Sequence, residues 1–237
     1  MDIGLIHFDA SNRATTMNVN VSAPEPIDLE TLTFPKQCYT GMSLDPYVLK
    51  DIVRLLEDGV KDIVEFGSGA STEFLLNLRG DKDLDFTLDS FDHSTKYSFK
   101  SSYPPENFNL MIRDLVQYTD AEFTSMMYGL EIPPGSPLPE DQYFNFRVKN
   151  VFYDLKDADL KAHYDLVILD GPSGNGRSVA FRHLANRVRT GTKIVIDDYH
   201  HYPFVNDCRK LLNVEVIKQI NLPEVHPLHG YAILEVR

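Results

Sequence analysis

The sequence predicts an α/β protein with a doubly wound, Rossmann-like sheet that is mostly parallel and ends in an antiparallel strand pair. Two observations predict this fold. Apolar runs that end in an acid followed by turn residues recur along the chain, which is typical of buried parallel strands. Segments with apolar residues at helical spacing lie between these runs. Strands that alternate with helices form parallel sheets with right-handed crossovers.

The first half of this domain begins with a capped helix. Asp45 stands at the N-cap and Pro46 at the first helical position, and apolar residues at helical spacing continue to Leu56. The next elements alternate between strand and helix. We expect strands over 62–66, 85–91 and 108–112, and a helix over 71–78 that ends at Gly80.

The second half contains an interruption and then returns to the same alternation. Residues 118–142 are rich in Pro, Gly and Met, which indicates an insertion or lid within a domain spanning 45–237. The polar residues 1–44 are expected to form an N-terminal arm. We expect further strands over 143–152, 164–169, 193–196, 214–220 and 231–236, and helices over 178–189 and 205–212. The last two strands are too close for a helical crossover, so they should pair antiparallel.

Composition excludes several classes of function. The chain has 237 residues, 43% of them hydrophobic, and a formal net charge of −12, which argues against non-specific binding to nucleic acid. No apolar stretch is long enough to span a membrane, and no signal peptide is apparent. Cys38 and Cys208 lie far apart and are expected to be free thiols, which fits a cytoplasmic protein. Four arginines are expected to form a solvated helix face: Arg177, Arg182, Arg187 and Arg189.

The stretch from Lys61 to Glu73 indicates a nucleotide-type site. It contains an apolar strand with Glu65 near its end, the turn Gly67-Ser68-Gly69, and a helix that opens with Ser71 and Thr72. Glycine lets a ligand approach the main chain closely, and the N–H groups at a helix start favour electron-rich ligand groups. Such strand-to-helix turns bind nucleotides in open α/β sheets.

Acids end four of the expected parallel strands, and these ends should meet at one edge of the sheet. The acids are Glu65, Asp92, Asp170, and Asp197 with Asp198. Asp92 lies 23 positions beyond Gly69, a distance that suits the hydroxyls of a ribose. The alternatives are a solvated acid or a helix cap at Asp92, and a structural acid at Glu65 that bonds the turn.

These strand ends resemble those of class I S-adenosylmethionine-dependent methyltransferases. Residues 65–72, Glu-Phe-Gly-Ser-Gly-Ala-Ser-Thr, look like the cofactor loop of that family, whereas a dinucleotide fingerprint would have a third glycine near Thr72. Residues 90–93, 166–172 and 194–199 are similar to its later strand ends, and the closing strand pair also matches. The resemblance implies the following cofactor contacts: Glu65, Gly67, Ser68, Gly69, Ser71, Thr72, Asp92, His93 and Asp170, with His93 near the adenine.

The resemblance extends to divalent-cation-dependent O-methyltransferases. Asp170 on one strand end with Asp197 and Asp198 on the next looks like their metal site, and Asp-Asp-Tyr followed by Cys208-Arg209 is similar to the macrocin-type sugar enzymes. Mg²⁺ or Mn²⁺ prefers such oxygen ligands and would orient a sugar hydroxyl. The alternative is that Asp197 caps a helix or bonds main chain and that no metal binds. The segment 199–203, Tyr-His-His-Tyr-Pro, departs from the sugar enzymes.

Two residues are candidates for the base that accepts the hydroxyl proton. His200 lies just beyond the acid pair and titrates near neutrality, and Asp170 offers a carboxylate at the same edge. The leading hypothesis is therefore a metal-assisted O-methyltransferase that acts on a hydroxyl of a small-molecule or glycan acceptor. Other acceptors (small aromatic or protein), aminopropyl transfer to polyamines, a non-catalytic cofactor-binding module and a dinucleotide oxidoreductase are the alternatives. The oligomeric state stays open, with a homo-oligomer among the possibilities.

Overall fold

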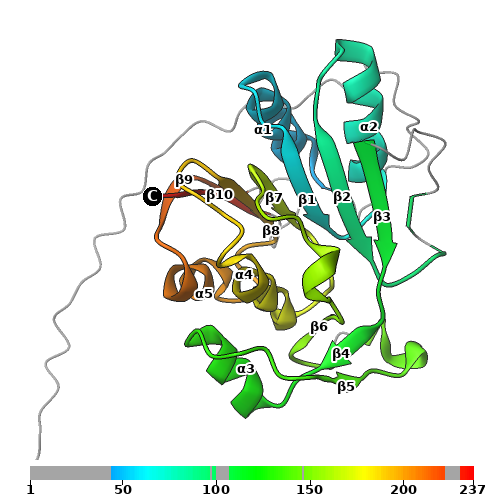
Figure 1. The fold of residues 1–237 in the computed structure, drawn as a ribbon, viewed down its shortest axis with the longest axis vertical. Coiled ribbons are helices and arrows are strands. Elements are labelled where there is room, and N and C mark those ends of the chain that lie inside the picture. Colours follow the sequence, from blue (N-terminus) through cyan, green and yellow to red (C-terminus); the bar gives the residue numbers. More distant parts are fainter. Residues whose placement is uncertain (1–43, 97, 100–106, 146, 222–229) are drawn as a thin grey trace, which may run out of the picture.

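A computed structural model describes residues 44–96, 98–99, 107–145, 147–221 and 230–237 (Figure 1). Nearly all of the expected N-terminal arm, with Cys38, lies outside these residues. In the described part of the chain, seven strands form a central sheet in the order β3-β2-β1-β7-β8-β10-β9. The strands are β1 (Asp62–Phe66), β2 (Thr87–Asp92), β3 (Phe108–Ile112), β7 (Leu166–Leu169), β8 (Lys193–Asp197), β9 (Val214–Asn221) and β10 (Gly230–Val236).

The pairing of these strands confirms the predicted fold class. Strands β3, β2, β1, β7 and β8 pair in parallel, and β10 runs antiparallel to both of its neighbours, β8 and β9. The chain therefore forms a Rossmann-like α/β sheet that closes with an antiparallel strand pair. No described helix is long and apolar enough to cross a membrane.

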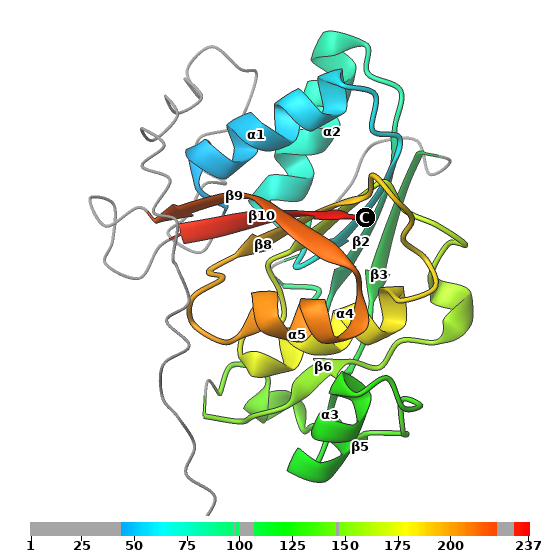
Figure 2. The same cartoon turned by 90° about the vertical axis from the view of Figure 1, so that its left-hand side faces the viewer.

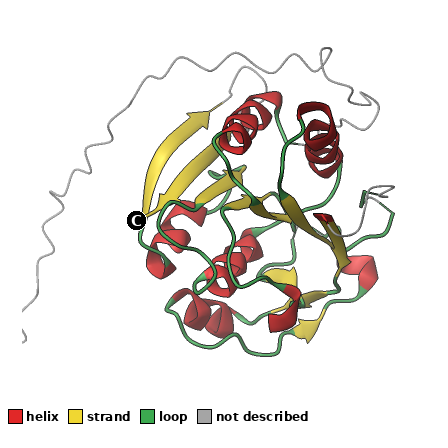
Figure 3. Ribbon diagram, turned by 45° about the horizontal axis from the view of Figure 1, so that its top comes forward, coloured by secondary structure: helices red, strands yellow, loops and turns green. Residues whose placement is uncertain are grey.

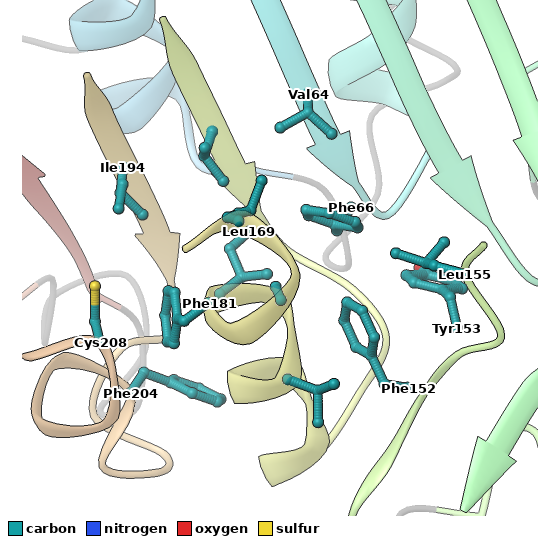
Figure 4. Packing of buried hydrophobic residues seen from close by; sticks show 14 of the residues in the cluster. Val64, Phe66, Phe152, Tyr153, Leu155, Leu169, Phe181, Ile194, Phe204 and Cys208 are labelled. Atoms are coloured by element: carbon teal, nitrogen blue, oxygen red, sulfur yellow. The ribbon is translucent and has the colours of Figure 1, made fainter. Parts of the chain in front are cut away.

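Helices cover both faces of the sheet (Figures 2 and 3). The sheet therefore separates the buried apolar residues into two clusters, one on each face. On one face, α1 (Pro46–Glu57) and α2 (Ala70–Lys82) pack against side chains such as Ile63 and Ile168. On the other face, α4 (Val179–Leu184) and α5 (Phe204–Leu211) pack against Phe66 and Leu169 (Figure 4). Alternate residues of each strand point to opposite faces, so one buried strand supplies both cores.

A second, smaller sheet lies at the carboxyl ends of the parallel strands (Figure 1). It has the order β5-β4-β6 and contains β4 (Leu115–Gln117), β5 (Ser136–Pro137) and β6 (Val151–Tyr153). Helix α3 (Asp120–Met127) follows β4, and Thr119 caps it by accepting a hydrogen bond from the Glu122 N–H. The region expected to be an insertion or lid therefore carries regular structure that packs on the main core.

Three sequence-based expectations for single elements were wrong. Helix α2 continues through the exposed Gly80 and ends at Lys82, and its C-cap residue Asp83 has a φ of 52°. Residues 143–145 and 147–150 are irregular, and only Val151 and Phe152 of the expected strand lie in β6, which pairs with β4. The helix expected over 178–189 is a short 3₁₀ turn, Asn175–Ser178, followed by α4 alone. Packing determines that turn, because a Cβ on Gly176 would lie 2.0 Å from the Val151 carbonyl oxygen.

Candidate functional site

The carboxyl edge of the parallel strands gathers the candidate residues. Strands β2, β1, β7 and β8 are consecutive neighbours in the sheet, so their carboxyl ends lie side by side. This edge carries Asp92 at the end of β2, the glycine turn after β1, Asp170 after β7, and Asp197 at the end of β8 with Asp198 following. In open α/β sheets, the crevice beyond these ends is where ligands bind.

The turn at Gly67 brings two main-chain segments into close contact. Gly67 has a φ of 105°, and a Cβ built on it would lie 2.8 Å from the backbone nitrogen of Gly171. Its N–H donates to the Phe91 carbonyl, and the Gly171 N–H donates to the Phe66 carbonyl. Only glycine combines this backbone conformation with this approach. The turn therefore places main-chain atoms without a side chain at the centre of the carboxyl edge, between β1 and β7.

Glu65 lies behind this turn and holds it together. Its carboxylate is fully buried and accepts hydrogen bonds from the hydroxyls of Ser71 (2.5 Å), Thr72 (2.5 Å) and Ser90 (2.7 Å). The Thr72 hydroxyl oxygen also accepts the Gly69 N–H at 3.0 Å. Burial raises the pKa of Glu65 to about 7, against the lowering effect of these hydroxyls. In the described chain Glu65 thus supports the turn from inside, which is the structural alternative raised for it.

Asp92, at the end of β2, is also largely buried and bonds the same turn. Its carboxylate accepts the N–H groups of Ser68 (3.1 Å) and Ser94 (2.8 Å), and burial raises its pKa while these bonds lower it. The ring of His93 follows and packs against Tyr143, Phe144 and Tyr153, with its Nδ1 3.6 Å from the Asp92 carboxylate. Burial lowers the pKa of His93, so the ring is held neutral.

The aspartates after β7 and β8 interact with one another. The pKa of Asp170 is raised to about 6, chiefly by burial; Arg177 lowers it and the negative charge of Asp198 raises it. The pKa of Asp197 is raised by burial and then by the charge of Asp170. Asp198 has a φ of 51°, an uncommon conformation for a residue other than glycine, at the point where the chain leaves β8. The three carboxyl groups expected together are thus within electrostatic reach of each other.

This arrangement does not fit the predicted metal site. Among the residues that the structure describes, no group of three or more His, Cys, Asp or Glu side chains is placed to hold a metal ion. The Asp197 carbonyl oxygen instead accepts a hydrogen bond from Arg177 at 3.1 Å. We therefore derive no chemical step through a metal.

The histidine candidates lie at the periphery of the edge. His200 is exposed, and its ring contacts those of Tyr199 and His201. His201 lies with its Nδ1 3.6 Å from the Asp198 carboxylate. Of the two base candidates, Asp170 is the one that lies against the Gly67 turn, because its carbonyl carbon is 3.2 Å from a Cβ built on Gly67.

Sequence reasoning missed the role of Arg177 and placed the basic cluster wrongly. Arg177 is buried, not solvated, and donates to the carbonyl oxygens of Pro172 (3.0 Å) and Asp197. It therefore ties the loop after β7 to the end of β8. The other arginines bond separate partners: Arg182 the Leu130 carbonyl, Arg187 the Asp157 carboxylate, and Arg189 the Asp165 carboxylate.

Tyr153 of β6 is the second residue that sequence reasoning missed. Its side chain is fully buried, and its hydroxyl would lie 2.8 Å from a Cβ built on Gly171. Residues of the same small sheet also line a small cavity beside the segment that follows β7. Its lining includes Leu115, Tyr143, Val151, Pro172 and Ser173.

Comparisons with known proteins complete the description of the site. The sequence matches no family model and no curated protein. Among solved structures, the chain is similar to TrmN from Thermus thermophilus (10% identity, TM-score 0.47, 86% of this chain and 52% of that one). It is also similar to the SAH-bound Podospora anserina methyltransferase PaMTH1 (13%, 0.46, 86% and 83%). A third is the O-methyltransferase from Bacillus cereus in complex with SAH (13%, 0.45, 84% and 84%).

These likenesses are too distant to carry the activities of those proteins to this chain, because one fold hosts many functions. The chain also spans only about half the length of the TrmN structure that it matches. The activity, substrates and partners of this chain are therefore proposals that rest on its own site residues.

Proposed function

We propose that the protein is an S-adenosylmethionine-dependent methyltransferase that transfers the methyl group to an oxygen atom. The observation that supports this most is the glycine turn after β1 together with the acid beside it. Gly67 in this turn has a φ of 105°, and the Asp92 carboxylate accepts a hydrogen bond from the Ser68 N–H of the same turn. A glycine turn with an acid at the next strand end is the arrangement that receives a nucleoside in open α/β sheets. The family resemblance of residues 65–72 and 90–93 directs the choice to this methyl donor.

The residues present fit the donor. Gly69 forms the N-cap of α2 without any side-chain cap, so the first-turn N–H groups are available to a ligand. No Cβ projects from Gly67, and the ring of His93 supplies an apolar face beside Asp92. Ser68, Ser71 and Thr72 hold the turn through hydroxyl groups. S-adenosylmethionine, when bound, supplies an electrophilic methyl group on a sulfonium.

Asp170 is the residue that we propose as the base. It lies beside the Gly67 turn, and its pKa of about 6 leaves it mostly ionised at neutral pH but able to take up a proton. A substrate hydroxyl that approaches the edge would pass its proton to Asp170 as its oxygen bonds to the methyl carbon. The bond from that carbon to the sulfonium sulfur would break, and S-adenosylhomocysteine would leave as the thioether. His200, the other candidate, lies on the exposed loop after β8 and would act only on a substrate that reaches this loop.

For the acceptor we propose a hydroxyl of a sugar or glycan, on the strength of the resemblance of residues 166–172 and 194–199. A polar acceptor suits the surface after β7, where the exposed Ser173 follows Pro172 beside the small cavity. The metal-assisted version of this hypothesis is tested separately. Loss of transfer on treatment with EDTA, restored by Mg²⁺ or Mn²⁺, would support it, and full transfer in EDTA would exclude it.

Calorimetry on the full chain with S-adenosylmethionine and S-adenosylhomocysteine tests the donor. We expect both to bind, and we expect Asp92→Asn to weaken binding about tenfold or more by removing a charged acceptor. Asp85→Asn is the matched control, because Asp85 is exposed just before the same strand and pairs with Lys61. If the wild-type protein binds neither S-adenosylmethionine nor S-adenosylhomocysteine, the proposal is overturned.

Methyl transfer from radiolabelled donor to a panel of sugars, polysaccharides, phenols, proteins and polyamines tests the acceptor. Label incorporated into a sugar hydroxyl is the expected result. Incorporation only into one of the other classes would refute the sugar assignment and leave the donor assignment intact.

A further inference from the structure

Unpartnered polar atoms are concentrated next to the proposed donor site. Four buried side-chain nitrogen or oxygen atoms in the described part of the chain have no hydrogen-bond partner, and three of them are the Tyr153 hydroxyl and the two ring nitrogens of His93. The rings of Tyr153 and His93 lie 6.4 Å apart between centroids. A buried polar group without a partner is unfavourable and uncommon in folded proteins. Such a cluster indicates a place where a ligand supplies the missing partners.

Tyr153 is held firmly in this place by other aromatic rings. Its ring stacks on Phe66 of β1, with 6.2 Å between the ring centroids, and contacts Phe152 (Figure 4). The Phe91 ring lies 6.4 Å from it between centroids. Its hydroxyl lies against Gly171, at the point where the strand ends of β1 and β7 come closest. The hydroxyl is therefore fixed at the centre of the edge by a residue of the small sheet.

The charges around this hydroxyl favour a cation. The carboxyl groups of Asp92, Asp170 and Glu65 act on it, and the Arg177 guanidinium opposes them. Burial, followed by the charge of Asp92, holds the pKa of Tyr153 well above its usual range, so the hydroxyl stays neutral. A neutral phenol oxygen can accept a hydrogen bond, and its acidic surroundings stabilise positive charge nearby.

We propose that the Tyr153 hydroxyl is a binding residue for the cationic end of the methyl donor, the α-ammonium or the sulfonium group. This inference rests on the proposed function and extends it, since it makes the small sheet a wall of the donor site. The donor would then satisfy the hydroxyl that lacks a partner within the described chain, and β6 would position the reacting end of the donor beside Asp170.

The test is Tyr153→Phe, measured by calorimetry with S-adenosylmethionine and S-adenosylhomocysteine and by thermal unfolding without ligand. We expect affinity for S-adenosylmethionine to fall about tenfold, while the unfolding midpoint without ligand stays the same or rises because an unpaired hydroxyl has been removed. An equal loss of affinity for S-adenosylmethionine and S-adenosylhomocysteine would assign the contact to the α-ammonium group, which both compounds carry. A loss confined to S-adenosylmethionine would assign it to the sulfonium.

Tyr164→Phe is the matched control. The Tyr164 hydroxyl is also buried, but it donates to the Asp89 carboxylate at 3.0 Å and accepts the Lys161 N–H at 2.9 Å, before the start of β7. We expect this variant to unfold at lower temperature and to bind the donor normally. Unchanged donor affinity in Tyr153→Phe, or an affinity loss accompanied by a lower unfolding midpoint, would refute the inference. If the wild-type protein binds neither S-adenosylmethionine nor S-adenosylhomocysteine, the proposed function itself fails.

Discussion

Replacing Glu65 by Gln isolates the electrostatic cost of the glycine turn. The Glu65 carboxyl is fully buried beneath the turn, and three hydroxyl groups are its hydrogen-bond partners. Gln has nearly the same shape but cannot ionise. The substitution therefore removes one titration from the folded protein and leaves the packing of the turn in place.

The magnitude follows from the pKa of Glu65, which is about 7 in the folded chain against an ordinary value of 4.5. The folded state therefore binds this proton more tightly than the unfolded state, and its stabilising effect is present below pH 4.5 and is lost as the pH rises through 7. The total effect is about 3 kcal/mol, of which about 2.5 kcal/mol falls between pH 5 and pH 8. Glu65→Gln lacks this loss.

Urea denaturation of both proteins at pH 5 and pH 8 measures the effect. The stability of the variant relative to wild type should rise by about 2.5 kcal/mol from pH 5 to pH 8, because the other acids titrate alike in both proteins. At pH 5 the variant should be the less stable by about 1 kcal/mol for each hydroxyl bond that the amide cannot accept. Glu131→Gln, at an exposed position, shows the effect of removing one charge from a chain of net charge −12. A pH-independent difference for Glu65→Gln would refute the reasoning.

Three further variants test the rest of the edge. Gly67→Ala should destabilise the protein by about 1–3 kcal/mol, because the new Cβ would lie 2.8 Å from the Gly171 nitrogen and the backbone φ there is strained for alanine. In Gly80→Ala, a Cβ in helix α2 meets nothing within 4 Å, so this variant should be more stable by about 1 kcal/mol. Urea denaturation measures both changes. Arg177→Met should cost about 2–4 kcal/mol in the same assay, since two loop carbonyls and a group of carboxylates lose their buried cation; a loss below 1 kcal/mol would contradict this role. Asp170→Asn should lower kcat at least about a hundredfold, and the wild-type rate should rise with pH through about 6 as this group ionises; a rate without that rise would exclude Asp170 as the base.

The centre of the sheet could be predicted from the sequence because strands such as β1 and β8 are buried on both faces. Such strands are nearly continuous apolar runs, so the predicted range for β1 matches the structure and that for β8 differs by one residue. The predicted range for β3, a partly exposed edge strand, also matches. The acids that follow these runs were also placed correctly at one edge, since parallel neighbours share their carboxyl ends. Both inferences need only local sequence and a general rule of topology.

The elements that could not be predicted depend on contacts between distant segments. The spacing of Arg177 suggests a solvated helix face, but its guanidinium bonds the carbonyl groups of Pro172 in the loop after β7 and of Asp197 at the end of β8. The alternation over 143–152 suggests a strand, but Asn150 has a φ of 57° and its side chain bonds Asn175, so regular pairing begins only at Val151. Local periodicity contains no information on such partners.

The candidate site shows how an acidic edge remains compatible with folding. Burial disfavours the ionised form of a carboxyl group and neighbouring like charges disfavour it further, and both effects raise the pKa values of Asp170 and Asp197. Backbone N–H groups offset part of this cost at Asp92, and the Arg177 guanidinium offsets another part beside Asp170. A donor that arrives with a positively charged sulfonium and ammonium would add cations at the same edge. Binding such a ligand would relieve repulsion that the free protein retains, so the electrostatic strain of the edge would favour the charged donor over its neutral thioether product.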